Sequence, residues 1–325
     1  MKLRIATRKS ALALAQTNHI AECLKQLEPG LTVELVPMVT VGDRVLDRSL
    51  SEIGGKGLFV SEIEQAVLAG EADLAVHSLK DMPAELAEGL CLAAVPPRED
   101  PRDVLITSDG ASLMDLEAGA KIGTNSVRRT LQLRRQRNDL HYAMLRGNVD
   151  TRLGKLEAGE YRAIVLAAAG LRRLGLDKRP LVPLSIQESV PAVGQGALAI
   201  EARSADEATC TLLKKLECNT TRLCIEAERT FLSALGGDCN TPLAGHARFH
   251  EARHLRFDGL VGSIDGTEVV QGGAGTYLEP QDDPLERARQ LGRQVAETVL
   301  EQGGGALIEQ AKTIAHQRLD PRRLT

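Results

Sequence analysis

Residues 123–129 read GTNSVRR and residues 146–152 read RGNVDTR, two small polar loops that each carry a glycine and two arginines. A helical pattern follows each loop. Glycine lets a backbone approach a ligand, the free N–H groups at a helix start point at negative charge, and a guanidinium binds a carboxylate or phosphate through two parallel hydrogen bonds. The two loops therefore predict a small, strongly anionic ligand held by an α/β domain.

The first two hundred residues alternate short β-rich runs with helical patterns, which is typical of α/β domains built on largely parallel sheets. Ser10 is expected to cap the first helix and Pro29 to end it. Prolines 96, 97 and 101 indicate a linker into a second α/β unit, and the chain is expected to return near residues 190–197. Predicted strands cover residues 3–5, 33–39, 74–76, 104–106, 142–145 and 164–167, and a further helix covers 58–69.

The pattern changes at about residue 218, where a helix over 222–235 precedes alternating strands over 244–249, 255–261 and 269–271. A closing helix with one apolar face follows, which indicates a small α+β domain with its own core. The predicted domains are residues 1–98 with 197–217, residues 99–196, and residues 218–325.

Composition limits the possible functions. The chain has 325 residues, a net charge of −4, no tryptophan, three tyrosines and four phenylalanines, so it lacks the broad basic face and stacking aromatics of a nucleic-acid binder. No apolar run approaches membrane-spanning length, and polar residues interrupt any signal-peptide pattern. The six cysteines form no C-x-x-C pair and the histidines no ligand cluster, so we expect a cytoplasmic protein with reduced thiols and no metal.

Four further motifs stand in order along the chain: ATRKS at 6–10, GGKGLF at 54–59, HSLKDMP at 77–83 and GQGA at 194–197. With the two arginine loops, they resemble the porphobilinogen deaminase family, also called hydroxymethylbilane synthases, from residue 3 to about residue 245. The resemblance implies two type II periplasmic-binding-protein-like α/β domains flanking a cleft, plus a small C-terminal α+β domain that holds a cofactor.

The resemblance also implies a reaction. Family members are transferases of tetrapyrrole and heme biosynthesis that deaminate four porphobilinogen molecules and join them head to tail into hydroxymethylbilane. The chain grows on one dipyrromethane primer, which is made from the same substrate and bound through a cysteine thioether. The implied partner is therefore this small substrate rather than nucleic acid or a membrane, and the family is typically monomeric.

Cys239 matches the family's attachment cysteine and lies in a glycine-rich polar loop. From its context alone, a buried small hydrophobic residue is the more common interpretation of a lone cysteine. The chain departs from the family here, because Asp238 and Asn240 stand where the family usually has Gly and Gln or Ser. A neighbouring carboxylate disfavours the thiolate, and a Cβ restricts the backbone, yet attachment is still expected because the substrate-derived electrophile is reactive.

Asp81 is the predicted catalytic residue. By resemblance, its carboxylate lies against the pyrrole nitrogens, where it stabilises positive charge and exchanges protons. Taken alone, an aspartate before Met82-Pro83 is also a common helix cap or turn residue. His77 follows a buried strand and is expected to orient the loop.

The remaining site residues match family positions that bind acetate and propionate groups. For single arginines near helix starts, solvation or pairing with Asp and Glu is the competing interpretation. The predicted cofactor-binding residues are Arg8, Ser78, Lys80, Arg128, Arg129, Arg146 and Arg152, beside Cys239. The predicted substrate-binding residues are Arg8, Arg146, Arg152, Arg173, Gln195, Lys56 and Phe59.

A hinged, non-catalytic binding protein that closes on an anionic metabolite explains the fold and the arginine loops equally well. It does not explain Asp81 and Cys239 in one constellation, and a transport receptor would carry an export signal. Phosphoryl transfer lacks support because the chain has no Walker-type loop.

Overall fold

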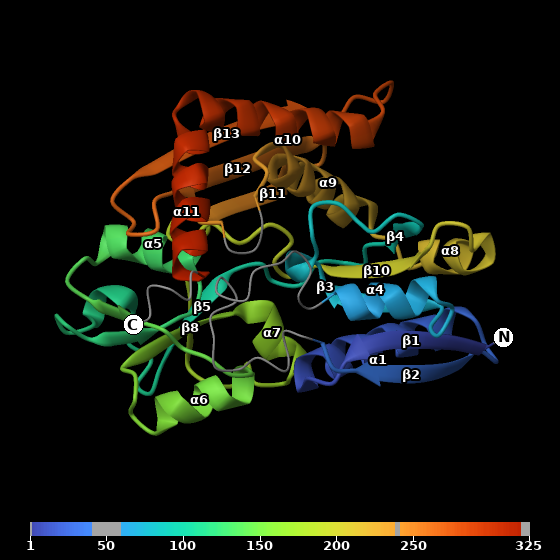
Figure 1. Cartoon of the computed structure of the whole chain (residues 1–325), viewed down its shortest axis with the longest axis horizontal. Helices are drawn as coiled ribbons and strands as arrows, with labels where there is room; N and C mark the ends of the chain where they lie inside the picture. The colour runs from blue at the N-terminus through green and yellow to red at the C-terminus, as the bar shows by residue number, and fades with distance from the viewer. Residues whose placement is uncertain (1, 41–59, 238–240, 320–325) are drawn as a thin grey trace.

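The computed structural model describes residues 2–40, 60–237 and 241–319. Its strands form three sheets, with sheets A and B in the two halves of the lower layer of Figure 1 and sheet C above them. This arrangement agrees with two α/β domains and a small C-terminal α+β domain.

Sheet A has the strand order β2-β1-β3-β10-β4. Its strands are β1 Lys2–Arg8, β2 Thr32–Met38, β3 Leu74–Ser78, β4 Leu90–Ala94 and β10 Leu198–Arg203. β1 pairs in parallel with β2 and β3, whereas β10 is antiparallel to β3 and β4. The sheet is therefore largely parallel, as expected: β4 runs in the same direction as β1, β2 and β3, and β10, which arrives from sheet B, runs against these four.

Sheet B repeats this plan in the order β7-β6-β8-β5-β9. Its strands are β5 Asp103–Thr107, β6 Lys121–Gly123, β7 His141–Ala143, β8 Ala163–Ala167 and β9 Leu181–Pro183. Here β5, which arrives from sheet A, is antiparallel to β8 and β9. Each sheet thus contains one antiparallel strand that follows directly on a crossing from the other sheet: β10 in sheet A and β5 in sheet B.

Helices cover both sheets (Figure 1). They are α1 Ala11–Leu27, α4 Ser61–Leu68, α5 Val127–Gln136, α6 Val149–Glu157, α7 Ala168–Arg173 and α8 Glu207–Lys214, with short 3-10 turns at Leu79–Asp81 and Leu113–Asp115. The Ser10 side chain accepts a hydrogen bond from the Ala13 N–H, so the predicted cap of α1 is confirmed. α5 and α6 begin in the two arginine loops, as predicted.

Two segments cross between sheets A and B, one from β4 to β5 and the other from β9 to β10. They contact each other: the Glu99 N–H donates to the Gly196 carbonyl over 3.1 Å, and Arg98 Nε donates to the Gln195 carbonyl over 2.8 Å. Gly196 has φ +88°, and a Cβ there would lie 2.4 Å from the Glu99 oxygen. Only glycine allows the two crossings to lie this close.

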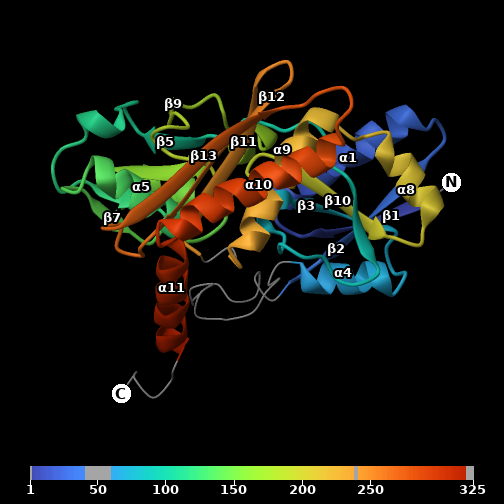
Figure 2. The ribbon, with the colours of Figure 1, turned by 90° about the horizontal axis from the view of Figure 1, so that it is seen from above.

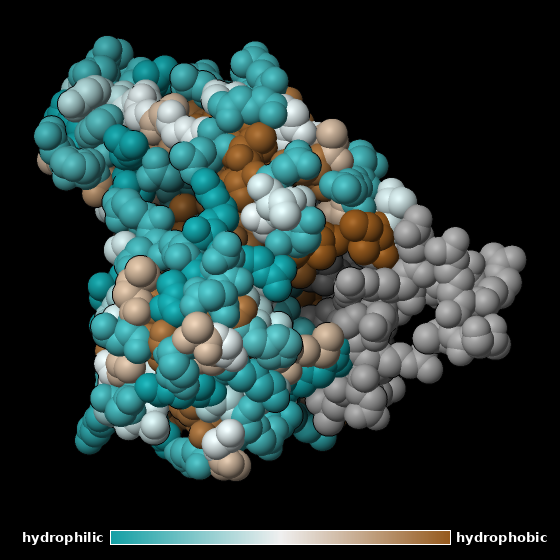
Figure 3. All heavy atoms as spheres, turned by 90° about the vertical axis from the view of Figure 1, so that its left-hand side faces the viewer, coloured by the Kyte–Doolittle hydropathy of each residue, from teal (hydrophilic) through white to brown (hydrophobic). Residues whose placement is uncertain are grey.

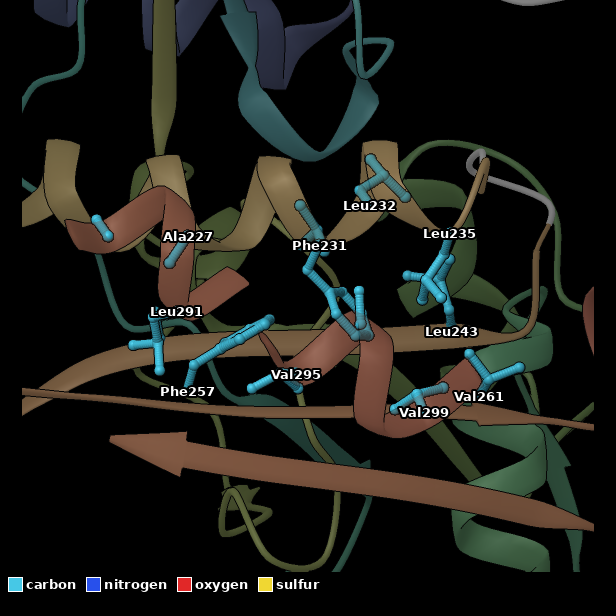
Figure 4. Packing of buried hydrophobic residues seen from close by; sticks show 14 of the residues in the cluster. Ala227, Phe231, Leu232, Leu235, Leu243, Phe257, Val261, Leu291, Val295 and Val299 are labelled. Carbon is cyan, nitrogen blue, oxygen red and sulfur yellow. The ribbon is translucent and has the colours of Figure 1, made fainter. Parts of the chain in front are cut away.

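The C-terminal part packs two helices on sheet C (Figure 4), which has the order β11-β12-β13. Phe231 and Phe257 form the centre of this core in an edge-to-face contact, with ring centroids 5.0 Å apart. Figure 2 shows α11, which the sequence pattern did not predict, projecting away from the sheets. The elements are α9 Asn219–Ala234, β11 Leu243–Glu251, β12 His254–Gly262, β13 Val269–Tyr277, α10 Pro284–Glu301 and α11 Gly304–Leu319.

Glu228 on α9 connects this third part to the crossings. Its fully buried carboxylate binds Arg98 in a bidentate pair (2.6 and 3.2 Å) and accepts the N–H groups of Gly194 (2.7 Å) and Ala247 (2.8 Å). Burial opposes its ionisation, but Arg98 and His246 more than compensate and lower its pKa to about 2. A charged carboxylate therefore joins sheet C to both crossings.

The face on the sheet B side is mainly hydrophilic, with one hydrophobic patch near its centre (Figure 3). In the part of the chain that the structure describes, no helix is long and apolar enough to cross a bilayer.

Candidate active site

The 3-10 turn Leu79–Asp81 follows β3 directly and lies against the second crossing. The Leu79 N–H donates to the Ala197 carbonyl over 3.0 Å. Gly194 has φ +73°, and a Cβ there would lie 2.3 Å from the Leu79 side chain and 3.0 Å from the Lys80 nitrogen. The crossing thus fixes the backbone that presents Lys80 and Asp81.

A small cavity of about 50 Å³ opens at the carboxyl ends of β1 and β3, beside the start of α1. Arg8, Gln16, Ser78 and Asp81 are among its lining residues. Gln16 and Ser78 hydrogen bond to each other, with Gln16 Nε2 2.9 Å from Ser78 Oγ. The Asp81 carboxylate forms no hydrogen bond or ion pair within the described ranges. It is therefore available to a ligand, as a general acid–base or a charge-stabilising group requires.

Arg128 and Arg129 bind a carboxylate that the sequence analysis did not single out. Arg128 Nη1 lies 2.7 Å from Asp103 Oδ2, and Arg129 Nη2 lies 2.8 Å from Asp103 Oδ1. Ser189 Oγ (2.8 Å) and Gln195 Nε2 (2.9 Å) donate to the same carboxylate. All of these side chains are buried, and Asp103 is 0% exposed.

Burial alone would raise the pKa of Asp103, but the charges of Arg128 and Arg129 hold it far below its usual range. Two cations share one anion, so the cluster keeps a net positive charge. Arg128 and Arg129 are therefore positioned by Asp103, and their contact with ligand carboxylates stays a prediction. Asp103 is the first residue of the apolar run DVLIT. A charged residue at the start of a buried strand was the only sequence feature that could have indicated its role in binding the two arginines.

Three predicted residues retain unused donors. Lys80 forms no hydrogen bond or ion pair in the described part of the chain. To other described residues, Arg152 donates only through its Nε, to the Gly147 carbonyl over 2.7 Å, and Arg173 donates one bond, to the Gly196 carbonyl over 2.7 Å. Burial is the main cause that lowers the pKa of Lys80 to about 8 and that of Arg152 to about 10. These partly desolvated cations fit a ligand that carries several carboxylates.

The other predicted residues are distributed as follows. Arg8 ends β1 at the cavity. Arg146 lies in the loop before α6, with its Nε 3.0 Å from Met144 Sδ. Gln195 is 1% exposed on the crossing, and its Oε1 has no hydrogen-bond partner in the described structure. Lys56, Phe59 and Cys239 lie outside the described residues.

Comparison with known proteins identifies the family. Residues 3–211 match the family model described as porphobilinogen deaminase, dipyromethane cofactor binding domain, and residues 222–301 match the porphobilinogen deaminase C-terminal domain. The chain belongs to the porphobilinogen deaminase family. This family is one of transferases of porphyrin biosynthesis, and its matched domain is the one that binds the dipyrromethane cofactor.

Named relatives agree with this assignment. The porphobilinogen deaminase of Brevibacillus brevis is 48% identical over 94% of this chain and 96% of its own length. That of Xanthomonas axonopodis pv. citri is 49% identical over 94% of this chain and 98% of its own. Among solved structures, the BenM effector-binding domain with benzoate has a TM-score of 0.40 at 14% identity, covering 72% of this chain and 93% of its own.

Lys80 provides a test of the carboxylate-binding interpretation. Because its pKa is about 8, Lys80 carries its charge below that pH and loses it as the pH rises further. When cofactor-free protein assembles its dipyrromethane from porphobilinogen, the KM of that reaction is therefore expected to rise in wild-type protein between about pH 7 and pH 9, by roughly tenfold for one lost charge-assisted hydrogen bond. The Lys80→Arg variant keeps its charge and should show a flatter KM profile. Identical profiles for the two proteins would contradict a role for the Lys80 charge in binding.

Proposed function

We propose that this member of the porphobilinogen deaminase family acts as a hydroxymethylbilane synthase, which deaminates four porphobilinogen molecules and joins them head to tail. The observation that carries the proposal is the Asp81 carboxylate. It forms no hydrogen bond or ion pair in the described ranges, and it lines a cavity together with Arg8.

Two overlapping sets of residues would bind the cofactor and the substrate. The carboxylates of the dipyrromethane would be held by Arg8, Ser78, Lys80, Arg128, Arg129, Arg146 and Arg152, with Cys239 as the covalent attachment. The incoming substrate would be held by Arg8, Arg146, Arg152, Arg173, Gln195, Lys56 and Phe59. When bound, the dipyrromethane supplies the pyrrole end on which the product chain is extended.

Asp81 supplies the chemistry that a binding protein does not need. Ammonia loss leaves positive charge on the substrate, and a fixed carboxylate stabilises that charge without waiting for solvent to reorganise. The same carboxylate accepts the proton that the ring carbon releases when the new bond forms. The Asp103 cluster holds the side chains of Arg128 and Arg129 in place. These guanidiniums would therefore lose little conformational entropy when they bind a ligand.

We also propose the domain division 1–98 with 197–217, 99–196 and 218–325, a monomer, and a cytoplasmic location. The domain division is supported by the sheets to which β4, β5, β9 and β10 belong.

The direct test is to incubate purified protein with porphobilinogen and to measure ammonia and linear tetrapyrrole together. A synthase releases about four ammonia molecules for each hydroxymethylbilane, because each added unit loses one. Tight substrate binding with no ammonia release would instead favour the hinged binding protein that the arginine loops also allow.

A further inference from the structure

Two cysteines meet where α8 packs against β4 at one end of sheet A (Figure 1). Cys91 Sγ on β4 lies 3.8 Å from Cys210 Sγ on α8, although the two residues are 119 positions apart in the chain. Both side chains are partly exposed. Among the cysteines that the structure describes, no other pair has its sulfur atoms in contact. An oxidant from solvent can therefore reach two thiols that the fold has already brought together.

A β-bulge in β4 turns Cys91 toward α8. Ile200 of β10 pairs with Ala94 of β4. Ala202, two residues further along β10, pairs with Cys91, which is three residues from Ala94. In a regular strand, residues three apart point to opposite faces of the sheet. The extra residue of the bulge puts Cys91 on the same face as Ala94 and Ala202, whose hydrophobic cluster also contains leucines of α8.

Cys210 is held over the same end of β10. The Asp206 side chain caps α8 by accepting the Thr209 N–H over 3.1 Å, and the Asp206 N–H donates to the Arg203 carbonyl over 3.1 Å. Cys210 Sγ donates to that same Arg203 carbonyl over 3.4 Å. Arg203 is the last residue of β10. Backbone contacts at the end of β10 therefore fix the positions of both thiols.

The surroundings keep this pair reduced until an oxidant arrives. Because the Cys210 S–H is donated to Arg203, Cys91 is the donor in the contact between the two sulfurs. Burial, followed by Cys210 and the charge of Glu201, raises the pKa of Cys91 to about 11, against a weaker opposing effect of Arg222. Cys91 is therefore a protonated thiol at neutral pH, and oxidation of the pair is expected to be faster at about pH 9 than at about pH 7.

We propose that Cys91 and Cys210 form a reversible disulfide when the protein meets a hydroperoxide, and that this bond fastens α8 to β4. One thiol, as its thiolate, attacks a peroxide oxygen; the O–O bond breaks, and a sulfenic acid and water are formed. The second thiol attacks the sulfenic sulfur and loses its proton, and the sulfenic oxygen leaves as a second water. Two thiols thus lose two electrons in total, and one hydrogen peroxide is reduced to two waters. The sulfurs move roughly 2 Å closer together in this step.

The proposed bond lies at the far end of sheet A from the catalytic turn. β10 pairs with Ser78 at Leu198 and with Cys91 at Ala202, about 13 Å further along the strand. Both crossings between sheets A and B leave sheet A at the Leu198 end. Formation of the disulfide is therefore independent of the role proposed for Asp81, and its detection needs no turnover.

The first test treats the reduced, purified protein with hydrogen peroxide and maps its tryptic peptides by mass spectrometry without reduction. Peptides 81–98 and 204–214 contain one cysteine each. They are expected to appear linked, two hydrogen atoms lighter than their sum, and to separate on treatment with dithiothreitol. Cys91→Ser and Cys210→Ser should each lose the linked species, whereas Cys23→Ser, which removes another partly exposed thiol, should retain it. Treated wild-type protein whose two peptides stay separate, as free or overoxidised thiols, would overturn the proposal.

The second test measures whether the bond fastens the fold. The disulfide closes a loop that contains the whole of sheet B, and cross-links over long loops restrict the unfolded chain most. The thermal midpoint of wild-type protein is expected to rise by roughly 5–10 °C after peroxide treatment and to return on reduction. Cys91→Ala, which lacks one of the two thiols, should show no such shift. An unchanged midpoint in protein that contains the linked peptides would overturn the claim that the bond fastens α8 to β4.

Discussion

The Asp81→Ala variant is expected to lose kcat by about a thousandfold while it folds and binds cofactor as the wild type does. General acid–base catalysis and charge stabilisation each typically contribute about two to three orders of magnitude, and because one carboxylate supplies both, the two losses overlap rather than multiply. Its carboxylate forms no hydrogen bond or ion pair in the described chain, so its removal leaves no buried partner unsatisfied. The loss should therefore appear in single-turnover rates and not in the thermal midpoint.

The matched control is Glu85→Ala, which removes an exposed carboxylate four residues further along the same segment. It is expected to keep wild-type rates. Asp81→Asn should be as slow as Asp81→Ala, because an amide keeps the shape but neither the charge nor the basicity. Near-normal turnover by Asp81→Asn would remove the role assigned to Asp81.

The Asp103→Asn variant is expected to lower the free energy of unfolding by about 3–5 kcal/mol, the usual cost of breaking a buried ion pair from one side. Asp103 accepts from Arg128, Arg129, Ser189 and Gln195 at once. An asparagine removes the charge that compensates two buried guanidiniums and places an N–H₂ group among donors. Urea unfolding at neutral pH measures the change.

The pH dependence of this effect has a definite sign. Since the folded-state pKa of Asp103 lies far below its usual range, its stabilisation is fully present above the ordinary aspartate range and declines as the pH falls from that range toward the folded-state value. Asp109→Asn is the control, because Asp109 pairs with Arg162 at the exposed surface, where ion pairs contribute little. If Asp103→Asn and Asp109→Asn lowered the free energy of unfolding equally, the stabilising role of the buried Asp103 ion pairs would be contradicted.

Local signals predicted the regular elements well. Ser10 marks the start of α1, and the arginine loops mark the starts of α5 and α6. β6 and β9 were missed because three residues are too few for a periodic pattern. The strand at β5 was predicted and that at β10 was not, but the antiparallel direction of both was missed, because the direction of a strand depends on where the chain comes from, which no local pattern records.

The residues of the candidate site also differ in how far local sequence could predict them. The cavity position of Asp81 follows from its place just after a strand, which the sequence shows. The pairing of Asp103 with Arg128 and Arg129 joins residues 25 and 26 positions apart, and that of Arg98 with Glu228 spans 130. Such pairs form only once the sheets and crossings are assembled, so resemblance indicated which arginines matter but not which carboxylates hold them.

The most direct test of the central claim is the intact mass of the purified protein beside its Cys239→Ser variant. A hydroxymethylbilane synthase is expected to carry an addition equal to two porphobilinogen units less two ammonia, present in the wild type and absent from the variant. A wild-type protein at its unmodified mass, with no gain after incubation with porphobilinogen, would contradict the assignment of Cys239 as the primer attachment and of the chain as a synthase.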